Sequence, residues 1–185
     1  MRIFAVAASL REGSYNRQLL EASVPYFEEH GADVEHRQFS DFDVPLYDKD
    51  IEKESGIARG AREFEESLLA ASGFVIVTPE YNHSIPGTLK NLIDWVSRIR
   101  PNQPFRGKPG MLMSASPSMV GGSRGLLHTR VPLQTLGARV FPDEFSLARA
   151  HEAFGEDGGL LDEKLDERLR ENVADFVDFV GRLTK

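Results

Sequence analysis

The chain has 185 residues, of which 41% are hydrophobic, so it is long enough to build one domain with a full core. Its 29 acidic residues outnumber its 22 Lys and Arg residues and give a net charge of −7, and an acidic surface repels nucleic-acid phosphates and anionic membranes. The absence of cysteine excludes disulfides, thiol nucleophiles and thiolate-bound metals.

Neither a membrane span nor a secretory signal is expected. No apolar run approaches the roughly 18 residues that a transmembrane helix needs. The apolar opening MRIFAVAASL is short, and the charged pair Arg11-Glu12 follows it at once. We therefore expect a soluble, cytoplasmic protein that binds neither nucleic acid nor membrane.

Short apolar runs alternate with helical patterns along the chain. In order, the patterns predict a strand at 2–8, a helix at 16–31, a strand at 33–40, a helix near 55–71, a strand at 73–78, a helix at 86–99, a strand at 109–116, a helix at 123–136, a short strand at 138–142 and a helical stripe from Leu161 to Leu183. Residues 41–56 are expected to form a long loop that covers a pocket or an interface. Pro25 and Pro132 fall inside helices and should bend them.

The fivefold alternation of strand and helix requires right-handed crossovers and a parallel sheet. Strands that are apolar throughout are typical of a sheet covered on both faces. The sequence therefore predicts one α/β domain over residues 1–185, with a doubly wound five-stranded parallel sheet and helices on both faces, in three layers.

Three loops follow the carboxyl ends of the expected strands, where open α/β sheets bind ligands: residues 9–16, 79–86 and 116–123. The first reads SLREGSYN and supplies donors from Ser9, Arg11, Ser14 and Asn16 just ahead of a helix. A helix N-terminus attracts anions, and an arginine adds a charge-assisted hydrogen bond. Helix capping explains one of these residues but not all four. The loop therefore predicts a phosphate site.

The predicted phosphate belongs to a mononucleotide. No G-x-G-x-x-G follows the first strand, which excludes the dinucleotide fingerprint. No G-x-x-x-x-G-K-[ST] occurs, which excludes a triphosphate loop. The second loop, PEYNHSIPG (79–87), carries more hydrogen-bonding groups than a connection between elements requires, which indicates a ligand contact there.

SLREGSYN, TPEYNHSIPGTLKNLIDWVSR and SASPSMVGGSRG resemble the three signature loops of the NADPH-dependent FMN reductase family. Its members have flavodoxin-like folds and include quinone and chromate reductases and relatives of the azoreductases. The resemblance covers essentially the whole chain, and the first two motifs together are specific. It implies that PEYNHSIPG wraps the flavin ring, and a flat ring with one polar edge needs such apolar cover and fixed polar groups.

The resemblance also implies which residues bind FMN: Ser9, Arg11, Ser14, Tyr15, Asn16, Pro79, Glu80, Tyr81, Asn82, Ser116 and Gly121. Small residues near the last of these permit close approach to a ligand. His83 departs from the family, in which another aromatic often stands, and we expect it to shape the pocket mouth. Arg124 and His128 should contact either the nicotinamide phosphate or a neighbouring subunit. Trp95 should lie in the core or at an interface.

The implied activity is hydride transfer from NADH or NADPH to FMN and reduction of a quinone-like acceptor by a ping-pong mechanism. The flavin carries the chemistry, so no catalytic side chain and no metal ligand is expected. Two alternatives stay open: a flavin reductase that supplies reduced FMN to a monooxygenase, and a flavodoxin-type electron carrier. The resemblance further implies a homodimer or homotetramer.

Overall fold

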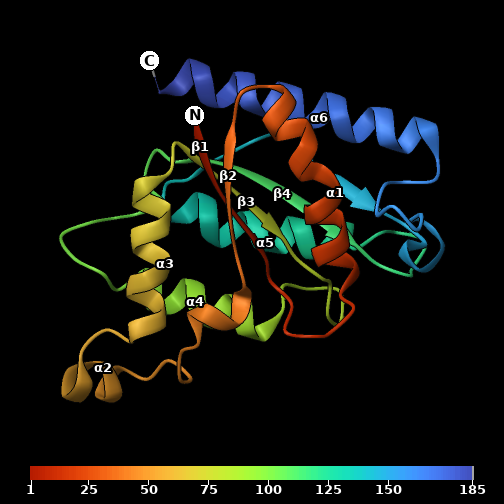
Figure 1. Cartoon of the computed structure of the whole chain (residues 1–185). Coiled ribbons are helices and arrows are strands. Elements are labelled where there is room, and N and C mark those ends of the chain that lie inside the picture. Colours follow the sequence, from red (N-terminus) through yellow and green to blue (C-terminus); the bar gives the residue numbers. More distant parts are fainter. Residues whose placement is uncertain (185) are drawn as a thin grey trace.

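The computed structural model describes residues 1–184 and has a parallel sheet at its centre (Figure 1). The strands are β1 (Arg2–Ala7), β2 (Asp33–Arg37), β3 (Gly73–Val77), β4 (Pro109–Ala115), β5 (Arg139–Val140) and β6 (Phe145–Leu147). Their order is β2-β1-β3-β4-β5, and β6 also pairs with β4. This is the flavodoxin-like doubly wound order, which places a crevice at the carboxyl ends of β1 and β3. The predicted fold class is confirmed.

Helices cover both faces of the sheet (Figure 1). On one face lie α1 (Tyr15–Glu29) and α6 (Glu163–Leu183), and on the other lie α3 (Arg59–Ala70), α4 (Gly87–Val96) and α5 (Ser123–Thr135). Successive strand side chains point to opposite faces. In β1, Ile3 therefore packs into the α1 and α6 side, while Phe4 packs under α3, and both are fully buried. Two cores explain why the central strands are apolar at nearly every position.

The fifth strand position differs from the single strand predicted at 138–142. It is made of two short pieces, because β5 pairs only with the first residues of β4 and β6 pairs with the last three. Pro142 lies between the pieces and has no N–H to donate to a ladder. The piece at the carboxyl end of the sheet, β6, supports the third of the predicted ligand loops.

The segment after β2 also differs from the sequence prediction. Part of the expected loop at 41–56 forms α2 (Lys49–Ser55), whose N-terminus is capped by Asp48 accepting from the Asp50 N–H at 2.7 Å. Gly56 ends this helix at a φ of 76°, so the helix expected from residue 55 begins only at Arg59. The Tyr47 hydroxyl donates to Glu52 of α2 at 2.7 Å, and this hydrogen bond lowers the pKa of Glu52.

Trp95 on α4 is completely buried, so the core prediction for it is confirmed. Its Nε1–H donates to the Pro45 carbonyl at 2.7 Å, and its ring meets Tyr47 edge-on at a centroid distance of 5.2 Å. These contacts fasten the segment before α2 to the body of the chain.

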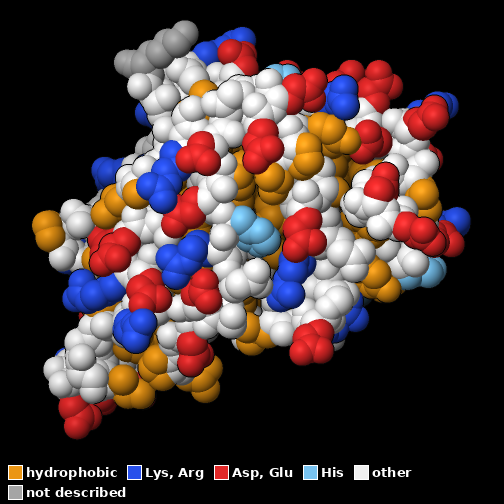
Figure 2. Space-filling view, in the orientation of Figure 1, with side chains coloured by type: hydrophobic (Ala, Val, Ile, Leu, Met, Phe, Trp, Pro, Cys, Tyr) orange, Lys and Arg blue, Asp and Glu red, His pale blue; other side chains and the backbone are white. Residues whose placement is uncertain are grey.

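Charged side chains of both signs are mixed over the face shown in Figure 2. The ion pairs of the chain include Arg37–Asp41 (3.2 Å) and Arg59–Glu63 (2.7 Å). Within residues 1–184, no helix is both long enough and apolar enough to cross a membrane.

Candidate functional site

The three predicted loops meet at the carboxyl ends of β1, β3 and β4. They enclose a cavity of about 220 Å³ whose lining comes from all three: Ser9, Arg11, Ser14, Tyr15, Asn16, Pro79, Glu80, Tyr81, Ala115, Ser116 and Pro117. Nine of the eleven residues implied by the family resemblance line it, whereas Asn82 and Gly121 do not. Ala115 and Pro117 were missed, because an alanine and a proline carry no polar signal in a sequence.

The first loop leaves the start of α1 open toward the cavity. Ser14 is the N-cap residue of α1 and is 2% exposed, yet its side chain makes no capping hydrogen bond. Arg11 folds back on the loop, with its guanidinium 5.2 Å from the centre of the Tyr15 ring and 3.2 Å from the Gly13 carbonyl oxygen. An uncapped helix N-terminus beside an arginine is suited to bind a phosphate.

Asn16 has a structural task that the sequence did not indicate. Its Nδ2 donates to the carbonyl of Ala115 and its Oδ1 accepts from the N–H of the same residue, both at 3.0 Å. The side chain is almost fully buried, so these two bonds satisfy its amide. Asn16 thereby ties the first loop to the end of β4, where the third loop begins.

The second loop contains a tight hairpin. The N–H of Tyr81 donates to the Ser84 carbonyl at 3.1 Å, and the N–H of Ser84 donates to the Tyr81 carbonyl at 3.0 Å. Asn82 and His83 between them both have positive φ, 51° and 61°, as a type I′ turn requires. Asn82 therefore serves the turn, which explains why it does not line the cavity. The hairpin holds Tyr81 at the cavity wall with 54% of its surface exposed.

Glu80 points away from solvent toward the start of α5. Its Oε2 accepts from the N–H of Gly125 at 3.0 Å, and its Oε1 lies 3.2 Å from Nδ1 of His83. The same nitrogen of His83 is 3.0 Å from Nη1 of Arg124. Nδ1 of His128 lies 2.9 Å from Oγ of Ser84. The hairpin is thus held on α5 by side chains from both elements.

The third loop rests on the chain that continues from β6. The Ser116 N–H donates to the Leu147 carbonyl at 3.0 Å, and the Ala150 N–H donates to the Ser116 carbonyl at 3.0 Å. A Cβ on Gly121 would lie 2.9 Å from the backbone of Leu147 and Ala148, so the small residue there makes room for the chain itself. The sequence prediction assigned this freedom to a ligand.

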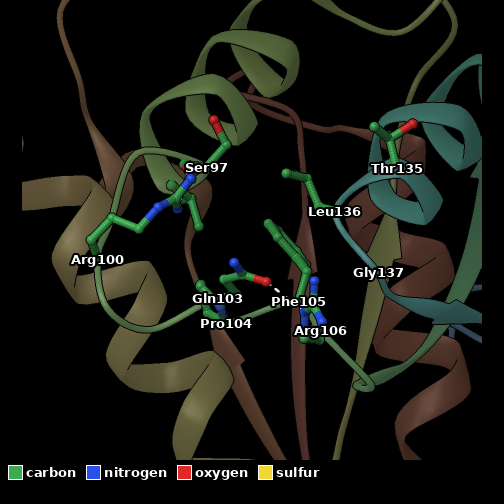
Figure 3. Close-up of a pocket in the computed structure, with 10 residues that line it drawn as sticks. Ser97, Arg100, Gln103, Pro104, Phe105, Arg106, Thr135, Leu136 and Gly137 are labelled. Carbon is green, nitrogen blue, oxygen red and sulfur yellow. Dashed lines mark hydrogen bonds between the residues drawn. The ribbon is translucent and has the colours of Figure 1, made fainter.

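A second cavity, of about 250 Å³, lies at the other end of the sheet between the C-termini of α4 and α5 (Figure 3). The charged side chains there already make hydrogen bonds within the protein: Arg100 donates to the carbonyls of Ser97 and Ile99, and Arg106 donates to Gln103. This cavity is far from the crevice that the strand order creates, and we assign it no role. Residues 1–184 contain no group of three or more His, Cys, Asp or Glu side chains placed to hold a metal ion.

Residues 1–152 match the NADPH-dependent FMN reductase family. The chain belongs to this family. It is 34% identical to the quinone reductase of Escherichia coli strain K12 over 185 residues, which span 99% of this chain and 97% of that protein. It is also 34% identical to an NAD(P)H-dependent FMN reductase of Pseudomonas aeruginosa, with the same coverage. Among solved structures, it is similar to FerB, a flavoenzyme NAD(P)H:(acceptor) oxidoreductase from Paracoccus denitrificans, with a TM-score of 0.84, 26% identity and coverage of 98% of this chain and 97% of that one.

Membership of the NADPH-dependent FMN reductase family confirms the resemblance and makes the chain an NAD(P)H-dependent oxidoreductase that uses FMN. The chemical types of the residues that line the cavity fit FMN. The open N-terminus of α1 with Ser14 and Arg11 suits the phosphate, and Pro79 and Tyr81 offer apolar surface beside it. The cavity volume of about 220 Å³ is below the roughly 300 Å³ typical of ligand pockets, so a bound flavin would extend beyond the enclosed part.

Proposed function

We propose that this chain is a single-domain FMN-dependent NAD(P)H oxidoreductase that reduces quinone-like small molecules. The observation that carries the proposal is the uncapped start of α1, with Ser14 and Arg11, placed beside the hairpin of the second loop in one cavity. The name quinone reductase of the 34% identical Escherichia coli relative supports the acceptor class. The cofactor supplies the hydride-accepting ring, so the protein needs no acid, base or nucleophile of its own.

In this proposal the site residues divide into three groups by what they contact. Ser9, Arg11 and Ser14 hold the phosphate, while Tyr15, Pro79, Tyr81 and Ser116 border the ring and its chain. The remaining implied residues hold the backbone of the protein in place: the Asn16 side chain binds Ala115, Asn82 forms the turn, and Gly121 admits the segment after β6. Glu80 belongs with this third group, because it accepts from the N–H of Gly125.

The kinetic test follows from the shape of the site. Because the second loop covers one side of the cavity, we expect nicotinamide and acceptor to use the same open side in turn. Oxidised nicotinamide must then leave before the quinone enters, and double-reciprocal plots at several quinone concentrations should be parallel. Steady-state oxidation of NADH and of NADPH with a benzoquinone measures this. Intersecting lines would contradict shared access, and activity that requires a continuous supply of free FMN would favour the flavin reductase alternative.

We further propose that the protein is a homodimer or homotetramer. Leu127 and Val131 lie one turn apart on the outer face of α5 and are 57% and 61% exposed. Tyr81 of the hairpin, which α5 contacts through His128 and Ser84, is 54% exposed. A second subunit on this side would cover these apolar groups and close the open part of the cavity. Light scattering should give at least twice the monomer mass of 20.7 kDa, and Val131→Lys should lower it. A fully active monomer would rule out this assembly.

A further inference from the structure

The start of α5 is capped by a residue from another element. Its own N-cap position is Gly122, which has no side chain to accept from the first-turn N–H groups. The carboxylate of Glu80 occupies that place, because its Oε2 accepts from the N–H of Gly125, the third residue of the helix, at 3.0 Å. The Glu80 side chain is only 10% exposed. A carboxylate in this position is stabilised by the helix dipole and by a charge-assisted hydrogen bond.

The glycines of GGSRG let this contact form. A Cβ on Gly122 would lie 2.0 Å from Oγ of Ser114 on β4, at a φ of 86° that other residues rarely adopt. A Cβ on Gly125 would lie 3.0 Å from Cβ and 3.1 Å from Cα of Glu80, tighter than side chains normally pack. The small residues of this stretch therefore admit Glu80 and β4 to the start of α5.

We propose that Glu80 is a positioning residue that locks the second loop onto α5 and so sets the shape of the FMN cavity. This contact acts on the wall of the cavity because Glu80 and its neighbours in the chain, Pro79 and Tyr81, all line the cavity. The contact of Glu80 with His83 adds little, since the ring of His83 is 72% exposed and solvent screens such pairs. This inference rests on the proposed FMN site and assigns the Glu80 side chain to α5 instead of to the flavin ring.

Two substitutions of Glu80 separate positioning from a direct charge effect on the flavin. Glu80→Ala removes the acceptor of the Gly125 N–H, and we expect it to weaken FMN binding by the apoprotein about tenfold. Glu80→Gln removes the charge but keeps an amide oxygen that can accept from the same N–H. It should therefore recover most of the affinity that Glu80→Ala loses.

Gly125→Ala tests the same contact from the other side. It leaves every polar side chain of the site in place and favours the helix intrinsically, but its methyl group meets Glu80. We expect it to weaken FMN binding as Glu80→Ala does.

Asp162→Ala provides the matched control. Asp162 caps α6 by accepting from the N–H groups of Lys164 and Leu165 at 2.9 and 3.1 Å, and it lines no part of the cavity. Both alanine variants remove a capping carboxylate, so both should lower the melting temperature of the apoprotein. Only Glu80→Ala should change the dissociation constant of FMN.

The experiment combines FMN titration of the apoprotein, followed by quenching of flavin fluorescence, with amide hydrogen exchange at Gly125. Exchange of the Gly125 N–H should quicken in Glu80→Ala and stay slow in Asp162→Ala, and this readout needs no cofactor. Wild-type affinity in Glu80→Ala, or a Glu80→Gln variant as weak as Glu80→Ala, would overturn the inference alone. Failure of the wild-type chain to bind FMN would overturn the proposed function together with it.

Discussion

Replacing Arg11 with alanine is expected to weaken FMN binding by about 10- to 150-fold and to leave riboflavin binding nearly unchanged. Riboflavin lacks the phosphate, so it makes no use of a guanidinium placed for that group. A hydrogen bond to a charged partner contributes about 1.5–3 kcal/mol, which corresponds to this range of affinity. Arg11 is held over the Tyr15 ring at the open N-terminus of α1, where such a bond can form.

Ser14→Ala should show the same preference for FMN over riboflavin with a smaller loss. Since the Ser14 side chain makes no capping bond to α1, its removal should leave the stability of that helix intact. Titration of the apoprotein with both flavins measures the two dissociation constants. Arg62→Ala is the charge-matched control, because Arg62 is exposed on α3 and lines no part of the cavity. Equal losses for FMN and riboflavin in the Arg11 variant would contradict the phosphate assignment.

The parts of the fold that local patterns determine were predicted well. The three central strands read as apolar runs because both of their faces are buried, and their observed ends lie within one residue of the predicted ones. The edge elements were predicted less well. The two residues of β5 and the three of β6 are too short to show a period, and they owe their existence to pairing with β4.

The site shows the same division between local and distant information. The donors of SLREGSYN lie close together in the chain, and so do the polar residues of the second loop. Each group could therefore be recognised from the sequence directly. The hydrogen bonds between Asn16 and Ala115 join residues 99 apart, and the hydrogen bond from Gly125 to Glu80 joins residues 45 apart. No local sequence pattern predicts such contacts. Asn82 carried a readable signal, since asparagine favours the first position of a type I′ turn.

The largest effect on stability is expected from Phe64→Ala. Phe64 on α3 is completely buried, and its ring meets Phe4 of β1 and Phe42 edge-on at 5.1 Å each and Phe105 at 6.1 Å. Removing such a ring loses its transfer free energy and leaves a cavity, which together cost about 3–5 kcal/mol.

A loss of this size is a large share of the roughly 5–15 kcal/mol by which folded domains are stable. Chemical denaturation of the apoprotein should therefore show a much lower midpoint for Phe64→Ala, with Phe64→Leu in between because leucine fills part of the space. Leu69→Ala on the same helix is the control, since Leu69 is 47% exposed and its loss should cost far less. A change below about 1 kcal/mol in Phe64→Ala would show that the aromatic cluster between α3 and β1 does not hold that face of the sheet together.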